Sequence, residues 1–135
     1  MKNSAARLAG VVVVLIFQLN FWTSYAQAAK QQIIVGKTGV FTLASATKVG
    51  DLTLQPGRYL LQHRQERSGG HAMHFVGFSP VYHGGIEASQ RFEQKCKVES
   101  LPARAARTRI FLVKANGGER ITRIEIKGEN VAHVF

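Results

Sequence analysis

The chain has 135 residues, with 18 Lys and Arg against 8 Asp and Glu, and its formal net charge at pH 7 is +10. This length suits a single domain, and the excess of positive charge favours anionic partners. Cys96 is the one cysteine, which excludes an internal disulfide, so packing must hold the fold together.

Residues 1–28 have the pattern of a secretory signal peptide. Lys2 and Arg7 give a basic start, and residues 8–22 are largely apolar. The segment Ala26 to Ala28 supplies the small residues that signal peptidase recognises. We therefore expect an N-terminal signal helix that is removed by cleavage, and export of the mature chain to the periplasm or the cell exterior.

The alternative is an uncleaved membrane anchor. Gln18 and Asn20 interrupt the apolar run, which is shorter than the ~20 residues that span a bilayer. Cleavage would leave residues 29–135 with 16 basic and 8 acidic residues, a net charge of +8. A chain of this length can form one hydrophobic core without staples.

The mature chain consists of short apolar or alternating runs that are separated by turn residues, a pattern typical of strands. Strands are expected at residues 33–35, 40–43, 52–54, 59–64, 71–78, 91–98, 109–114, 120–127 and 131–135. Residues 81–88 are ambiguous because Gly84 and Gly85 break the pattern. Asn116 to Gly118 is a hairpin signal between two of these strands.

Residues 49–64 are the clearest part of the pattern. Two alternating runs flank a turn in which Pro56 sets φ at the first central position and Gly57 accepts a positive φ at the second. The sequence therefore predicts a β-hairpin with a type II turn. A lone hairpin is barely stable in water, so it must belong to a larger sheet.

Seven to nine short strands with intervening turns predict an all-β fold. The architecture that we expect is a single antiparallel β-sandwich of Greek-key type, Ig-like or transthyretin-like, over residues 29–135. No internal repeat or linker divides this range.

The segment Leu54 to Tyr59 resembles the Leu-x-Pro-Gly-x-Tyr turn of transthyretin-like and carboxypeptidase-regulatory-like sandwiches. It is also similar to a hairpin of small uncharacterised exported bacterial β-sandwich proteins. The resemblance covers about 16 residues and implies the fold. Transthyretin-like enzymes carry His and Arg motifs that have no counterpart in this sequence, so no site residue is carried over.

Motifs of common enzymes are absent from the sequence: it has no Gly-x-Ser-x-Gly elbow, no His-Glu-x-x-His helix and no glycine-rich phosphate loop. The single aspartate, Asp51, follows a glycine at the start of a strand, where turn formation explains it. We expect a protein that is not an enzyme and that has no cofactor, and specifically a non-catalytic exported binding domain or an envelope-associated accessory domain.

Basic residues are concentrated in one stretch of the chain. The candidate anion-binding residues are Arg91, Lys95, Lys97, Arg104, Arg107 and Arg109. If their two strands pair, the six side chains form one face that attracts anionic polysaccharide, lipopolysaccharide or phospholipid head groups. Nucleic acid is disfavoured because exposed aromatic residues do not alternate with these cations. The simpler alternative is a solvated face that keeps the protein soluble.

A second function is binding of copper or zinc, because imidazole and thiolate groups are ligands for both metals. The candidate ligands are His63, His74 and Cys96. The first two share a face if Ser68 and Gly69 form a two-residue turn, since His63 then stands opposite His74. In that case the protein is a small periplasmic metal-binding protein.

The alternative for these three residues is purely structural. Two histidines then lie at the rim of the core, and Cys96 is a small buried hydrophobic residue, as many free thiols are.

Overall fold

The computed structural model describes residues 29–78, 86–115 and 117–135. The proposed signal peptide, residues 1–28, lies outside this part of the chain. Ten strands are found in the described residues: β1 (Ala29–Ile34), β2 (Val40–Leu43), β3 (Thr47–Val49), β4 (Leu52–Leu54), β5 (Gly57–Gln65), β6 (His71–Phe78), β7 (Ile86–Ser100), β8 (Arg109–Ala115), β9 (Gly118–Glu125) and β10 (Val131–Val134). That part of the chain holds no helix with the length and apolarity to cross a membrane.

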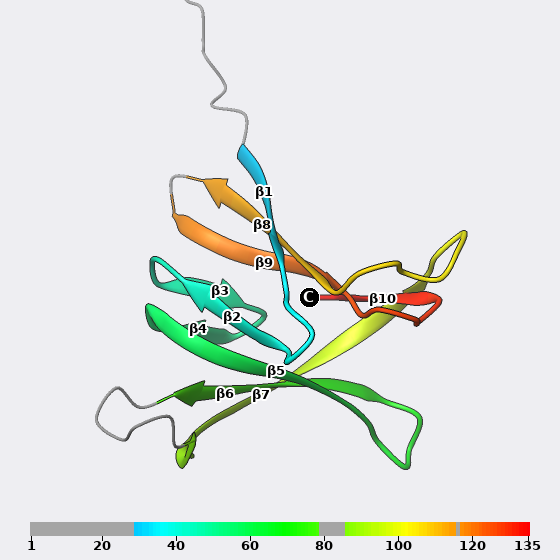
Figure 1. The fold of residues 1–135 in the computed structure, drawn as a ribbon, viewed down its shortest axis with the longest axis horizontal. Coiled ribbons are helices and arrows are strands. Elements are labelled where there is room, and N and C mark those ends of the chain that lie inside the picture. Colours follow the sequence, from blue (N-terminus) through cyan, green and yellow to red (C-terminus); the bar gives the residue numbers. More distant parts are fainter. Residues whose placement is uncertain (1–28, 79–85, 116) are drawn as a thin grey trace, which may run out of the picture.

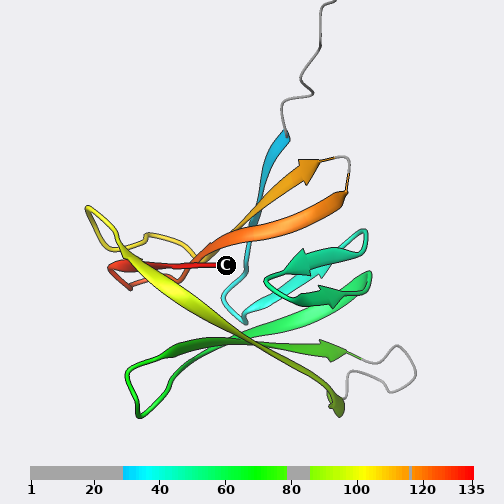
Figure 2. The same ribbon diagram turned by 180° about the vertical axis from the view of Figure 1, so that it is seen from behind.

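Hydrogen bonding joins the strands in the order β1-β8-β9-β10-β7-β6-β5-β2, with β3 attached to β9 and β4 attached to β3. All pairs in this order are antiparallel, whereas β3 pairs with β9 in parallel. The long strand β7 runs from the layer that contains β5 and β6 to the layer that contains β10 (Figures 1 and 2). The expected all-β antiparallel fold is confirmed, and its sheet is nearly barrel-shaped.

Strands β7 to β10 have the Greek-key arrangement. The strands β8, β9 and β10 follow one another as neighbours. β7, which the long connection at residues 101–108 joins to β8, lies beside β10. The hairpin between β8 and β9 is confirmed, with Ala115 opposite Gly118, while Asn116 lies outside the described residues.

The hairpin predicted for residues 49–64 is wrong. β4 pairs with β3, and β5 pairs with β2 and β6, so the chain turns a corner between two sheets at Pro56. Gly57 has the expected positive φ, but its value of 152° differs from the ~80° of a type II turn. The Tyr59 hydroxyl donates a hydrogen bond of 2.7 Å to the carbonyl of Gln55 and so ties the corner together.

The apolar core fills one end of the interior. Phe41 of β2 lies 5.9 Å from the Tyr59 ring and 6.3 Å from the Phe75 ring, measured between centroids. Aliphatic residues from both sheets complete the cluster: Val35, Leu43, Val49, Leu54, Leu61, Ile110, Leu112, Ile121 and Ile124. At the other end of β5 and β6, the residues on this inner face are histidines.

Candidate metal centre

Three histidines converge at the polar end of the interior. His63 lies on β5, His71 on β6 and His133 on β10. One ring nitrogen of each lies within 4.8 Å of one ring nitrogen of the others. The rings of His63 and His71 stack with centroids 5.1 Å apart, and the His133 ring is 4.3 Å from that of His63.

The strand register explains why His63 and His71 meet. His63 is paired with Met73, and His71 is two residues from Met73 on the same strand. Because side chains alternate between the two faces of a strand, both histidines lie on the inner face. His63 Nε2 and His71 Nδ1 are 2.8 Å apart, which is a hydrogen-bonding distance.

The strands β7 and β10 each place a further residue on the inner face. Cys96 is paired directly with His71, and Val98, two residues further along β7, is paired with His133. Cys96 and His133 therefore share the inner face. Four consecutive strands of the sheet, β10-β7-β6-β5, thus each place one residue in the group.

The expected pairing of His63 with His74 is wrong. Gln62 is opposite His74, because three residues, Arg67 to Gly69, form the loop between β5 and β6 instead of two. A loop that is one residue longer shifts the register by one and turns His74 to the opposite face. There its Nε2 lies 3.2 Å from a Glu93 carboxylate oxygen, away from the other histidines.

Glu129 joins two of the three imidazoles. Its Oε1 is 3.0 Å from His63 Nδ1, and its Oε2 is 2.7 Å from His133 Nε2. A carboxylate can only accept hydrogen bonds, so each of these ring nitrogens carries the proton that it donates. The other nitrogens, His63 Nε2 and His133 Nδ1, are then free to accept a hydrogen bond or to bind a metal ion.

The position of Glu129 is fixed by the loop before β10. The carbonyl of Glu129 accepts a hydrogen bond of 2.9 Å from the Ala105 amide, and the Gly128 amide donates one of 2.8 Å to the Ala105 carbonyl. Arg104 Nη1 also donates to the Gly128 carbonyl at 2.8 Å. The long connection between β7 and β8 therefore holds the carboxylate in place.

His133 is the most enclosed member of the group, since its side chain is fully buried. Burial lowers the pKa of His133, and the hydrogen bond to Glu129 opposes this change. The pKa thus moves in the direction that favours the neutral imidazole, which is the form that binds metals.

Cys96 lies at the edge of this group. Its Sγ is 3.6 Å from His133 Nδ1 and 3.4 Å from the carbonyl oxygen of His71. Burial, together with the nearby Glu129 carboxylate, raises the pKa of the Cys96 thiol to about 11. In the metal-free protein Cys96 is therefore a thiol at neutral pH, and a metal ion that bound it would displace the proton.

No family model, curated protein or solved structure matches the chain. The function must therefore be inferred from the chemistry of these residues.

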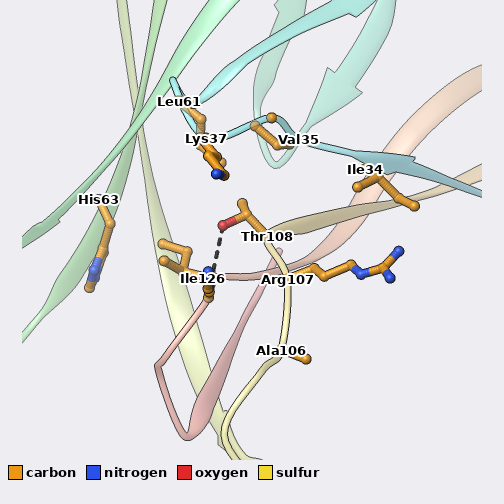
Figure 3. A pocket seen from close by; sticks show the side chains of 12 residues that line it. Ile34, Val35, Lys37, Leu61, His63, Ala106, Arg107, Thr108 and Ile126 are labelled. Atoms are coloured by element: carbon orange, nitrogen blue, oxygen red, sulfur yellow. Dashed lines mark hydrogen bonds between the residues drawn. The ribbon is translucent and has the colours of Figure 1, made fainter.

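A pocket of about 510 Å³ adjoins the histidines (Figure 3). His63 lies on one side of it, with Leu61 and Val35 above and Ile126 below in this view. The lining also includes residues from the segment between β1 and β2 and from the connection between β7 and β8. The pocket thus gives access from solvent to the neighbourhood of His63.

The single face expected for the six candidate anion-binding residues depends on the pairing of β7 with β8. β7 and β8 are not neighbours, because β10 and β9 lie between them in the sheet. Arg91, Lys95 and Lys97 are exposed on β7. The strand pairing on which the expected face depends is therefore wrong.

The other three candidates, Arg104, Arg107 and Arg109, each have different neighbours. Arg104 donates to the Gly128 carbonyl, as described above. Arg109 forms an ion pair with the buried Glu125 and lies over the Phe111 ring. Arg107 is exposed and lines the pocket beside His63.

His71, His133 and Glu129 were not among the ligands expected from the sequence. A signal for two of them exists, because Glu129 and His133 are four positions apart and His133 lies in the strand expected at residues 131–135. His133 is the one polar residue in the apolar run of residues 131–135, which indicates a buried histidine. His133 and His63 are far apart in the sequence, however, so the sequence alone does not indicate that they are in contact.

Proposed function

We propose that the protein binds one transition metal ion through His63, His71 and His133. The observation that carries this proposal is the approach of three imidazole nitrogens to within 4.8 Å of one another on one face of the sheet. Imidazole binds zinc, copper, iron and nickel, so these donors suit a transition metal and do not suit calcium or magnesium, which prefer oxygen ligands.

The spacing of the donors supports the proposal. Ligands of a tetrahedral zinc ion, with bonds of ~2.0–2.3 Å, are roughly 3.3–3.8 Å apart. Cys96 Sγ and His133 Nδ1 are 3.6 Å apart, which fits such an arrangement directly. His63 Nε2 and His71 Nδ1 are closer, at 2.8 Å, so these two rings would separate by about 0.5 Å as a metal ion replaced their hydrogen bond.

Glu129 supports the site from outside. In many metalloproteins a carboxylate accepts the second N–H of a ligating histidine, which fixes the tautomer and raises the basicity of the ring. Glu129 is placed to do this for His63 and His133 at the same time. Both rings then direct a bare nitrogen at the site.

Cys96 is the proposed fourth ligand and selects among metals. One thiolate with three imidazoles is a donor set for zinc or copper. Four protein ligands also close the coordination sphere, and closed sites serve structure, storage or transfer more often than catalysis. We therefore propose a non-catalytic metal-binding protein of the periplasm or cell exterior.

The decisive experiment compares two histidines of the same strand. Zinc and Cu⁺ are titrated into metal-free protein with residues 29–135, and binding is followed by calorimetry. We expect one ion per chain. His71→Ala should weaken binding by at least ~100-fold, the loss of a directly bound imidazole. His74→Ala is the matched control, because His74 lies on β6 but faces away from the group.

Equal binding by the two variants would contradict the proposal, as would wild-type protein that takes up no ion. The cluster would then be a hydrogen-bonded part of the core. Cys96→Ser tests the fourth ligand separately, and we expect a smaller loss for zinc than for Cu⁺, because Cu⁺ is the softer ion.

A further inference from the structure

The pocket beside His63 has apolar walls. Val35 and Leu61 are buried core residues, and Ile126 is partly buried against the same core. These side chains surround the opening from β5, the turn before β2 and the segment after β9 (Figure 3). The volume of about 510 Å³ is within the ~300–1,000 Å³ range of small-molecule sites.

The charged residues of the lining are all positive. Lys37, Arg107 and Lys127 are exposed and line the pocket, and no Asp or Glu is among the lining residues. Within the described parts of the chain, none of the three cations forms an ion pair. The Lys127 amide is held by a hydrogen bond of 3.1 Å from its N–H to Thr108 Oγ1, which fixes the backbone at the mouth (Figure 3).

We propose that this pocket binds a single-chain amphiphile with an anionic head group, such as a medium-chain carboxylate. The alkyl chain would lie against Val35, Leu61 and Ile126, and the head group would lie among the three cations. Removal of the alkyl chain from water supplies most of the affinity, and the cations select the charge of the head group.

This proposal does not rest on metal binding. Both ring nitrogens of His63 are already engaged, Nδ1 with Glu129 at 3.0 Å and Nε2 with His71 at 2.8 Å. An amphiphile in the pocket would therefore contact the ring of His63 without replacing a metal ligand. The two sites are neighbours that share one side chain.

The test uses three ligands with one alkyl chain and different head groups. Octanoate, octan-1-ol and octylamine are titrated into metal-free protein by calorimetry. We expect octanoate to bind at least ~10-fold more tightly than octanol and octylamine to bind most weakly, since charge–charge contacts in a partly desolvated pocket discriminate strongly. Decanoate should bind roughly tenfold more tightly than octanoate, for two further buried methylenes.

A triple variant tests the cations. Lys37, Arg107 and Lys127 are changed together to Gln, which should remove the preference for octanoate over octanol while octanol binding stays the same. The matched control changes Lys30, Arg67 and Lys114 to Gln, three exposed cations outside the pocket with the same total charge. Circular dichroism checks that both variants fold, which we expect because all six positions are exposed.

Equal affinities for the three ligands in wild type would overturn the proposal, as would identical effects of the two triple variants. Binding of a heparin oligosaccharide that depends on the pocket cations, without octanoate binding, would also overturn it in favour of a polymer. All of these titrations use metal-free protein, so their result stands or falls separately from the metal site.

Discussion

The two ends of β5 and β6 line the same interior with different chemistry. At one end Tyr59 and Phe75 belong to a tightly packed aromatic cluster with Phe41. At the other end, on the same inner face, His63 and His71 contact each other through their ring nitrogens. The strands are continuous, so the change from apolar to titratable residues takes place within a few positions.

These two ends contribute differently to stability. Burial of one large apolar side chain contributes ~1.5–3 kcal/mol to folding. Buried polar groups cost free energy unless every donor and acceptor is paired, and an apolar replacement is often neutral or stabilising. Stability therefore does not explain the cluster of three histidines, a glutamate and a thiol, and functional sites are where local rules of folding are commonly broken.

The largest effect on stability should come from the apolar end. Phe75 is fully buried, and Phe75→Ala should lower the free energy of unfolding by about 3–5 kcal/mol through lost burial and a cavity. Urea denaturation measures this loss. The zinc affinity of the remaining folded protein should be unchanged, and a large loss of affinity would show that the two ends are not independent.

At the polar end, the expected change is in metal affinity. Glu129→Gln keeps the size of the side chain but weakens its hold on His63 and His133, and removal of such an outer partner typically lowers metal affinity by ~10–100-fold. That change equals about 1.4–2.7 kcal/mol of binding free energy. Zinc competition with a chelator of known affinity measures it. An unaltered affinity would exclude Glu129 as a support of the site.

Gly57 lies at the corner between β4 and β5. A substitution there should affect both ends of the interior only through the stability of the fold. Gly57 has a positive φ of 152° and nothing within 4 Å of the position that a Cβ would occupy, so a side chain there is strained by the backbone and not by contact. Gly57→Val should cost on the order of 1–2 kcal/mol in a thermal or urea melt. Gly36→Val is a suitable control, since Gly36 also has open space around it and no positive φ.

Acid should have a smaller effect, confined to the polar end. Burial holds the pKa of His133 below its ordinary value of 6.5, so the unfolded chain takes up a proton first as the pH falls. The stability of the metal-free protein should therefore decrease from pH 6.5 downward, until the folded pKa is reached. Glu129, His63 and His71 are the titratable groups that face the ring. The comparison is between wild type and His133→Gln, whose stability should depend less on pH in this range; equal slopes would contradict the assignment.

Most of the strands were predictable because alternation is a local property. The ranges expected at residues 40–43 and 71–78 agree with β2 and β6, and residues 109–114 lie within β8. Pairing was less predictable. Alternation in residues 49–64 is equally compatible with a hairpin and with two strands in different sheets, and only distant partners decide between them.

The candidate metal centre shows how one residue in a loop limits prediction. Arg67 to Gly69 form a three-residue loop with Gly69 at a positive φ of 89°, where a two-residue turn at Ser68 and Gly69 was expected. This single difference exchanges His74 for His71 on the inner face. His63 and Cys96 were identified from their chemistry, whereas the contribution of β10 depends on long-range pairing that the sequence does not reveal.

The proposal of a single metal ion held by His63, His71 and His133 is tested most directly by diffraction from crystals of zinc-loaded protein at the zinc absorption edge. We expect one anomalous peak per chain, about 2.0–2.1 Å from one ring nitrogen of each of the three histidines. A distance of about 2.3 Å from the zinc ion to Cys96 Sγ would identify the thiolate as the fourth donor. Absence of a peak among these rings, or a peak found only elsewhere on the chain, would contradict it.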